Sequence, residues 1–481
     1  MNKKDMVDYI ESQKDILTDL SDKIWEYSET AFEEHKSIEA MISVLEDYGF
    51  KIERNVGNIE TAFTASYGSG YPRIGILGEY DALSGLSQSA NEFEKKLNKE
   101  QENTNGHGCG HNLLGVGSMA AAIGAKKYLE ENKLDGEIIF FGCPAEEGGS
   151  GKTFMVRDGV FDGVDACLSW HPGNYNLVWT GSTLANYQVY FRFKGRSAHA
   201  AANPDQGRSA LDAVQLMNMG VEFLREHVVQ DARIHYAITD SGGFSPNVIP
   251  ASAEVLYLMR APKNYQVEDI YRRITNIAKG AALMTETEVK VDFVKACSEL
   301  VPNKAIEEVL HANMTEIGYP ELSSEDKDML KRYRDTINVD QDELEMFLNF
   351  AKQPEQKAFL KSYIEKPYND FIMPHVHTNM PMPGSTDVGD VSNVCPTSQI
   401  MVMTLASNTP GHSWQVVAQG KSNVAHNGMI YAGKVLASSA IDLFEDTEKI
   451  EKAKLELKEK LGSRGYKNPI PKDVVPRSIS K

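Results

Sequence analysis

A small set of thiol, imidazole and carboxylate side chains falls at points of the sequence where no ordinary structural role suggests itself. The set comprises Cys109 and His111 in "GHGCGH", Glu146 and Glu147 in "PAEEGG", His171 in "SWHPG" and His412 in "NTPGHSW". These are the three ligand types that zinc accepts, and a catalytic zinc keeps one position open for water. A lone histidine or cysteine is usually structural, but the ordered set predicts a metal site.

The spacing within the set suggests a division of roles. Cys109 and His111 alternate, so in an extended turn both side chains would contact one metal. Adjacent carboxylates at a strand end repel each other unless cations lie between them. One residue of the pair Glu146 and Glu147 can therefore bind metal while the other stays free as a base.

The segments that carry these residues alternate between apolar strands and helices. Strands are predicted in "RIGILGEYDAL", "EIIFFGCPAEEGG", "GVDACLSWHPG" and "TSQIMVMTLA", and each precedes one of the polar points. A small-residue helix begins at "HNLLGVGSMAAAIGAKKYLEENKLDG". This alternation is typical of an α/β sheet, in which functional groups gather at the carboxyl ends of the strands.

Past Gly181 the order becomes strand, helix, strand, strand, helix, strand, which is the ferredoxin-like βαββαβ module. We therefore expect an α/β catalytic domain in two parts, residues 1–182 and 299–481, with a ferredoxin-like lid or dimerisation domain inserted at 183–298. An acidic helical insertion at about 319–368 is interpreted as a solvated hairpin near the site. Charged amphipathic helices are expected at both ends, the first as one helix over 1–27.

The bulk composition excludes several classes of protein. At 481 residues the chain is too long for one ordinary core, and 41% hydrophobic residues supply enough material for two. A net charge of -18 argues against sequence-independent nucleic-acid binding, although metals in a cleft would still admit an anionic substrate. No apolar run is long enough to span a membrane, and five scattered cysteines do not form a disulfide framework, so we expect a cytoplasmic protein.

On these motifs the chain resembles the aminoacylase/glutamate carboxypeptidase family of dinuclear metallohydrolases, in the branch of N-acyl amino acid amidohydrolases. The resemblance runs from about Tyr9 to Phe444, and "STDVGDVS" and "GHSWQ" add to it. It implies two divalent ions per chain, zinc or manganese with cobalt also admitted. It also implies Glu146 as the general base and a ligand set of Cys109 as the bridge, His111, Glu147, His171 and His412.

Several assignments within the site stay open. His426 in "NVAHNGM" competes with His412, which we prefer because His426 begins a helix and suits a cap or surface position. Asp81 is expected to orient a ligand histidine, with a turn cap as the alternative. The sequence also departs from the branch, because Asn112 stands where aspartate is usual and Glu79 where aspartate is common.

The resemblance also implies substrate-side residues on the inserted domain. His199 in "KGRSAHAAANPDQG" corresponds to a lid histidine that donates to the tetrahedral oxyanion. Asn247 in "SPNVIP" and Arg260 in "YLMRA" correspond to substrate-binding residues, and the planar fork of arginine suits a carboxylate. A turn histidine and an exposed strand arginine are the structural alternatives.

The function expected from this resemblance is hydrolysis of the amide bond of an N-acyl amino acid, with p-aminobenzoyl-glutamate as the leading substrate. A broad aminoacylase or a dipeptidase is the enzymatic alternative, and a catalytically silent partner chain is the alternative of another class. We expect a homodimer or a heterodimer with a related chain, and neither nucleic-acid nor membrane partners. His199 would act either by closure of its own lid or across a dimer.

Overall fold

The computed structural model describes residues 1–338, 343–348, 354–364 and 366–478. Its larger sheet has seven strands in the order β1-β2-β4-β3-β5-β11-β6. The strands are β1 (Lys51–Arg54), β2 (Phe63–Ser69), β3 (Arg73–Glu79), β4 (Gly136–Cys143), β5 (Ala166–Gly173), β6 (Leu177–Val178) and β11 (Thr397–Met403). The four central strands β4, β3, β5 and β11 are parallel, and each outer strand pairs antiparallel with its inner neighbour.

Helices cover both faces of this sheet, which explains why its central strands are almost continuously apolar. One face packs against α1 (Lys3–Ser12), α2 (Lys14–Tyr27), α3 (His35–Asp47), α4 (His111–Asn132), α8 (Lys304–Ile317), α14 (Asn423–Glu445) and α15 (Thr447–Leu461). The other face carries the shorter α5 (Gly151–Arg157) and α12 (Val388–Val394). The predicted α/β class is confirmed.

The first 27 residues form two helices, so the expectation of one continuous helix was wrong. The break is at Gln13, whose ψ of 1° is not helical and whose N–H bonds to the carbonyl of Ile10. The break allows Ile10 on one helix and Leu17 on the other to be buried in the same core.

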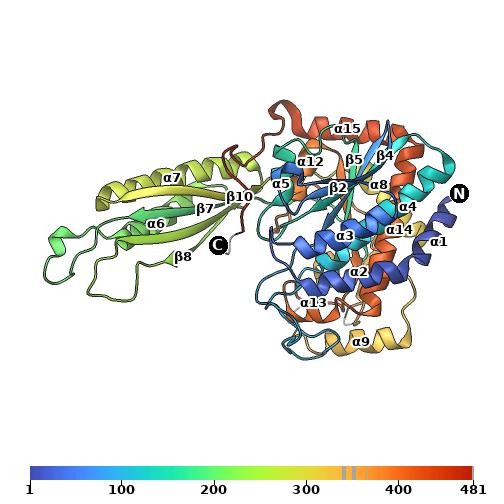
Figure 1. Cartoon of the computed structure of the whole chain (residues 1–481), viewed down its shortest axis with the longest axis horizontal. Coiled ribbons are helices and arrows are strands. Elements are labelled where there is room, and N and C mark those ends of the chain that lie inside the picture. Colours follow the sequence, from blue (N-terminus) through green and yellow to red (C-terminus); the bar gives the residue numbers. More distant parts are fainter. Residues whose placement is uncertain (339–342, 349–353, 365, 479–481) are drawn as a thin grey trace.

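The second sheet belongs to a separate unit that projects from the α/β body (Figure 1). It contains β7 (Ala185–Lys194), α6 (Ala210–Leu224), β8 (Arg233–Asp240), β9 (Ser252–Ala261), α7 (Asn264–Thr285) and β10 (Glu288–Cys297). The strands are antiparallel in the order β10-β7-β9-β8, with both helices packed on one another and on the sheet. This is the predicted ferredoxin-like module.

The acidic region at 319–368 is more than a solvated hairpin. Its described part contains α9 (Ser324–Arg334), α10 (Glu343–Leu348) and α11 (Pro354–Lys361). Tyr333 of α9 is buried and its hydroxyl donates to the carbonyl of Ala418, in the segment α13 (Trp414–Gln419) that follows His412. Leu344 and Leu360 form a second apolar cluster with Tyr175, just beyond β5. The apolar residues of this region are spaced as on amphipathic helices, but the many acidic residues between them obscured that spacing in the sequence. This is why the packing of the region was not predicted. Residues 339–342, 349–353 and 365 lie outside the described part.

None of the helices in the described part of the chain is both long enough and apolar enough to cross a membrane.

Candidate metal centre

The predicted ligands meet at the carboxyl edge of the parallel strands. Cys109, His111 and His171 each place one ligand atom within 4.8 Å of the others, and Cys109, Glu147 and His412 do the same. Cys109 is common to both groups. Its Sγ lies 3.4 Å from Nε2 of His171, while Nε2 of His412 lies 3.2 Å from Oε1 of Glu147. The arrangement gives two neighbouring groups of candidate ligands that share one thiol.

The turn before α4 sets the directions of Cys109 and His111. Gly110 has a φ of +73°, a left-handed conformation that glycine adopts without strain, and a Cβ there would approach Pro172 to 3.0 Å. His111 is the first residue of α4 rather than part of an extended turn, as the alternation had suggested. The sharp turn, not strand-like alternation, brings the two side chains together.

Two non-glycine residues of the centre also have left-handed backbones. Ala145, just before the glutamate pair, has a φ of 59°, and His412 has a φ of 55°. Glu34 accepts the Ala145 N–H at 3.0 Å, and the N–H of His412 donates to the carbonyl of Gly108 at 3.0 Å. Such conformations cost about 1–3 kcal/mol each and persist where surrounding contacts impose them, which is common at functional sites.

Asp81 contacts two of the predicted ligands and positions them. Its Oδ1 lies 2.8 Å from Nδ1 of His111, and its Oδ2 accepts the N–H of Glu147 at 2.9 Å. Nε2 of His111 therefore points into the centre, where it is buried without a hydrogen-bond partner among the described residues. This nitrogen lies 3.4 Å from Oε2 of Glu79, and a buried ring nitrogen that makes no hydrogen bond fits a metal ligand.

The electrostatics of the centre favour bound cations. Burial alone would raise the pKa of the Cys109 thiol, but His171 and His111 outweigh it and lower the pKa to about 6. Hydrogen bonds to Cys109 and Glu147 raise the pKa of His412 to about 10. Without metal, protons therefore compensate the thiolate and the carboxylate. Because a ligating imidazole must be neutral, divalent ions would replace those protons.

Glu146 lies beside the two cation groups without belonging to either of them. It shares a third cluster with Glu79 and His111, again within 4.8 Å. Burial and the negative charges of Glu79 and Glu147 raise the pKa of Glu146 well above its usual value. A carboxyl group that readily holds a proton, next to the metal positions, suits the work of a general base and acid.

A buried cation behind Glu146 was missed in the sequence. Nζ of Lys152 lies 2.6 Å from Oε1 of Glu79 and 2.6 Å from Oδ1 of Asp387, and all three side chains are almost inaccessible. Although burial opposes its charge, Asp387 and Glu79 raise the pKa of Lys152 well above its usual value. The only sequence signals were a lysine just after a glycine-rich turn and the aspartate of "STDVGDVS".

Other polar residues near the motifs have structural contacts. His107 is buried, its Nε2 lies 3.0 Å from the carbonyl of Ile24, and burial lowers its pKa to about 3. His426 lies within α14, and the N-cap of that helix is Ser422, so the cap interpretation of His426 was wrong. Its Nε2 lies 2.9 Å from Oδ1 of Asp22 on α2. Asn112 is buried and donates to Ser21 and to the carbonyl of Gly420. Neither His107 nor His426 belongs to the two groups of candidate metal ligands.

The three predicted residues of the inserted unit lie at two different ends of it. His199 follows the far end of β7, and the carbonyl of Asn247 accepts the N–H of the neighbouring Ala200 at 2.9 Å. Arg260 pairs with Asn186 near the start of β7, where the unit joins the α/β body. Since β7 has 10 residues, the two ends are separated by about 30 Å.

His199 is exposed, and its contacts identify which ring nitrogen accepts hydrogen bonds. Its Nδ1 accepts the N–H groups of Ala201 at 3.2 Å and Ala202 at 3.0 Å. In the neutral ring the proton therefore resides on Nε2, which makes Nε2 the donor of the ring. Arg260 is half-buried, and its Nε has no hydrogen-bond partner among the described residues.

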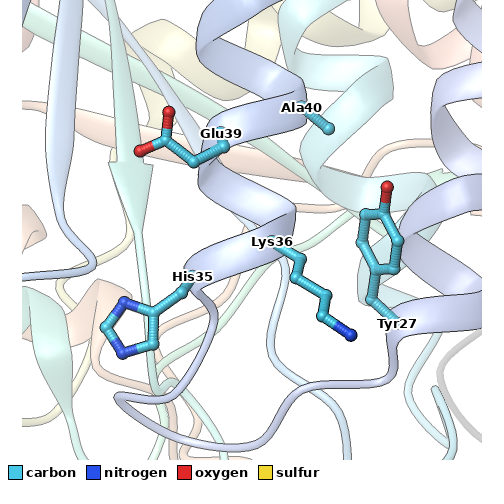
Figure 2. Close-up of a pocket in the computed structure, with 5 residues that line it drawn as sticks. All are labelled: Tyr27, His35, Lys36, Glu39 and Ala40. Carbon is cyan, nitrogen blue, oxygen red and sulfur yellow. The ribbon is translucent and has the colours of Figure 1, made fainter. Parts of the chain in front are cut away.

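A surface hollow elsewhere on the chain contains none of these residues. It is lined by Tyr27, His35, Lys36, Glu39 and Ala40, on α3 and the end of α2 (Figure 2). Nζ of Lys36 already pairs with Glu102 at 2.7 Å. The candidate metal ligands lie at the strand ends instead.

Known proteins match both parts of this architecture. The peptidase dimerisation domain M20_dimer matches residues 183–286. A dinuclear metal-binding peptidase of the M20 family from Bacillus subtilis has the same fold, with a TM-score of 0.53 at 17% identity over 90% of this chain and 99% of that one.

The chain belongs to the M20 family of metal-dependent peptidases and amidohydrolases, and it is a hydrolase of that kind. Within the family it is similar to the B subunit of p-aminobenzoyl-glutamate hydrolase from Escherichia coli, with 47% identity over 98% of both chains. The human Xaa-Arg dipeptidase is 25% identical over 96% of this chain and 93% of its own length.

Proposed function

We propose that the chain hydrolyses the amide bond of N-acyl amino acids at a two-metal centre, with p-aminobenzoyl-glutamate as its leading substrate. The observation that carries this proposal is the pair of ligand groups joined at Cys109, with the unbound carboxyl of Glu146 beside them. The substrate is suggested by the 47% identity with the Escherichia coli p-aminobenzoyl-glutamate hydrolase chain.

In the proposed centre Cys109, His111 and His171 would hold one ion, and Cys109, Glu147 and His412 would hold the other. Two divalent ions held there would acidify a water molecule and polarise the amide carbonyl. Zinc suits the thiolate, while the imidazole and carboxylate ligands also admit manganese or cobalt. The contacts of Asp81 support its role in orienting His111 and fixing the loop of Glu147.

Glu146 takes a proton from the attacking water and passes it to the leaving nitrogen. Its elevated pKa, caused by burial and by Glu79 and Glu147, supports a group that carries a proton between the two steps. Lys152 counters the negative charge around it, since it lies between Glu79 and Asp387. The positive charge of Lys152 allows the neighbouring carboxylates to lie close together at one edge of the sheet.

We further propose that His199 serves the centre of a partner chain. It lies at the far end of β7, about 30 Å from the point where the unit leaves the α/β body, so it extends away from its own centre. Its Nε2–H would donate to the tetrahedral oxyanion, with Asn247 beside it. Arg260, at the near end, would bind the substrate carboxylate in its own chain.

The inserted unit has the surface that such a dimer needs. β8 is an edge strand, open on one side, and edge strands readily pair with a second chain. Large apolar side chains are exposed on β8 and on the helices, namely Met219, Phe223, Tyr236, Ile238, Leu283 and Met284. The M20_dimer match supports a homodimer, while the related A subunit of the Escherichia coli hydrolase keeps a heterodimer as the alternative.

The substrate proposal is tested with the purified chain on p-aminobenzoyl-glutamate, an N-acyl glycine and a dipeptide ending in arginine. We expect release of p-aminobenzoate with the highest kcat/KM of the panel, sensitive to chelator and lost in Glu146→Gln. A preference for the dipeptide would favour the dipeptidase function, which the similarity to Xaa-Arg dipeptidase supports. No hydrolysis by the metal-loaded single chain would favour a silent chain that completes the site of a partner.

A further inference from the structure

A lysine of the inserted unit reaches the loop that carries the two glutamates of the metal centre. Lys295 lies near the end of β10, and its Nζ donates to the backbone carbonyl of Glu147 at 3.0 Å. Lys295 is only 9% exposed, and among the described residues no carboxylate forms an ion pair with it. Because buried lysines are usually paired with a carboxylate, the contact with a backbone carbonyl points to a different role for Lys295.

A β-bulge in β10 immediately precedes Lys295. Phe293 pairs with Val189 of β7, and Lys295 pairs with the adjacent Gln188, so Val294 is an extra residue in the ladder. A bulge bends its strand and is often found next to an active site, where it changes the direction of a side chain. The side chain whose direction changes here is that of Lys295.

The bulge decides which face of the sheet Lys295 occupies. Phe293 packs against Tyr271 of α7, with ring centroids 5.6 Å apart, so Phe293 lies on the face that the helices cover. Without the extra residue, the alternation of a strand would place Lys295 on that same apolar face. Instead, Ala296 lies in the core cluster of Phe293, and Lys295 lies on the opposite face of the sheet. From that face its side chain contacts the loop of Glu147.

The segment after β10 is fixed to the α/β body, which gives Lys295 a defined position. The N–H of Ser298 donates to Oδ2 of Asp390 at 2.9 Å, and the N–H of Val301 donates to Oγ of Ser392 at 2.8 Å. Asp390 and Ser392 both belong to α12, and both are buried. A group that orients a functional residue does so best from rigid elements of this kind.

The loop of Glu147 depends on contacts from outside itself. Glu147 lies in a turn and precedes Gly148 and Gly149, and glycine leaves the backbone more freedom than other residues do. Oδ2 of Asp81, in the α/β body, accepts the N–H of Glu147 at 2.9 Å. Lys295, in the inserted unit, donates to the carbonyl of the same residue. The two contacts fix the backbone on both sides of the Glu147 side chain and therefore set where its carboxylate points.

We propose that Lys295 is a positioning residue of the metal centre, which holds Glu147 in the direction that a metal ligand needs. This inference rests on the two-metal centre of the proposed function. Removing a group that orients a metal ligand typically lowers metal affinity or activity by about 10–100-fold. Because Glu147 belongs to only one of the two ligand groups, loss of Lys295 would weaken the binding of one ion and spare the other. The inserted unit thereby contributes to metal binding in its own chain.

The test measures how tightly the full-length protein holds each zinc ion. The zinc-loaded protein is titrated with a chelator of known zinc affinity, and the release of the two ions is followed. In Lys295→Met we expect the Kd of one ion to rise by about 10-fold or more and the Kd of the other to stay unchanged. Lys295→Arg keeps a cationic donor and should restore most of the affinity. Lys290→Met is the matched control, because Lys290 is exposed on the same strand, and it should bind both ions as the unmodified chain does.

A second measurement depends neither on zinc nor on hydrolysis. In the metal-free proteins, hydrogen exchange of the backbone N–H groups of residues 145–150 reports how firmly the loop is held. We expect faster exchange of these groups in Lys295→Met than in Lys290→Met, with exchange in the rest of the α/β body unchanged. Equal exchange in the two variants, or unchanged affinity for both ions in Lys295→Met, would overturn the proposal. Zinc binding without hydrolysis of any substrate would reject the proposed function and leave this result intact.

Discussion

Replacement of Lys152 by methionine should destabilise the protein far more than replacement of a surface lysine. Lys152 is 0% exposed and lies 2.6 Å from each of two buried carboxylates, Glu79 and Asp387. Methionine fills a similar volume but leaves those two charges uncompensated. Breaking a buried ion pair in this way typically costs about 3–5 kcal/mol.

This cost translates into a measurable shift in melting temperature. For the roughly 370 residues outside the inserted unit, an unfolding entropy of ~2.1 cal/mol/K per residue gives ~0.8 kcal/mol per kelvin. The Lys152→Met variant should therefore melt about 4–6 °C below the unmodified protein when followed by calorimetry. Lys454→Met is the matched control, because Lys454 pairs with Asp165 at 2.5 Å while 37% exposed. A partly exposed pair contributes about 1 kcal/mol or less, so this control should lose ~1 °C at most.

A charge-balance test completes the argument. If uncompensated carboxylates cause the loss, adding Asp387→Asn and Glu79→Gln to Lys152→Met should recover part of the melting temperature. If Lys152→Met were no more harmful than Lys454→Met, Lys152 would not be compensating buried charge, and this description of the region behind Glu146 would be refuted.

Three further predictions concern the reaction itself. Glu146→Gln should keep its metal and lower kcat by ~10² or more, whereas Glu147→Gln should lose metal on gel filtration; exchanged effects would reverse the roles of the two glutamates. His199→Ala should leave metal content and melting temperature unchanged and lower kcat/KM by ~10² or more. Mixing this variant with Glu146→Gln should restore some activity through hybrid dimers. No recovery despite exchange of chains between dimers would rule out action of His199 across the dimer. Arg260→Ala should raise KM for substrates with a free α-carboxylate and spare their amidated analogues; equal effects on both would remove Arg260 from carboxylate binding.

The strand-end pattern explains why the main site was predictable from sequence. Cys109, Glu147 and His171 each lie near the end of a strand or at the start of a helix, and parallel strands bring such ends together regardless of the intervening loops. The ferredoxin-like order was visible for a similar reason, because each of its elements has a local periodicity.

Contacts between distant segments were not predictable in this way. Lys152 and Asp387 are 235 residues apart, and the local sequence around either residue does not indicate contact with the other. The break at Gln13 and the apolar contacts of the acidic insertion depend on tertiary packing, which overrides the local helical pattern.

The dinuclear centre is tested most directly by the metal count of Cys109→Ala, with hydrolysis of p-aminobenzoyl-glutamate measured on the same samples. Because Cys109 belongs to both ligand groups, its loss leaves two protein ligands for each ion. We predict that this variant retains two zinc ions fewer per chain than the unmodified protein after gel filtration and has no measurable hydrolysis. Loss of one ion or none, or hydrolysis at the unmodified rate, would contradict a centre in which Cys109 joins two metals.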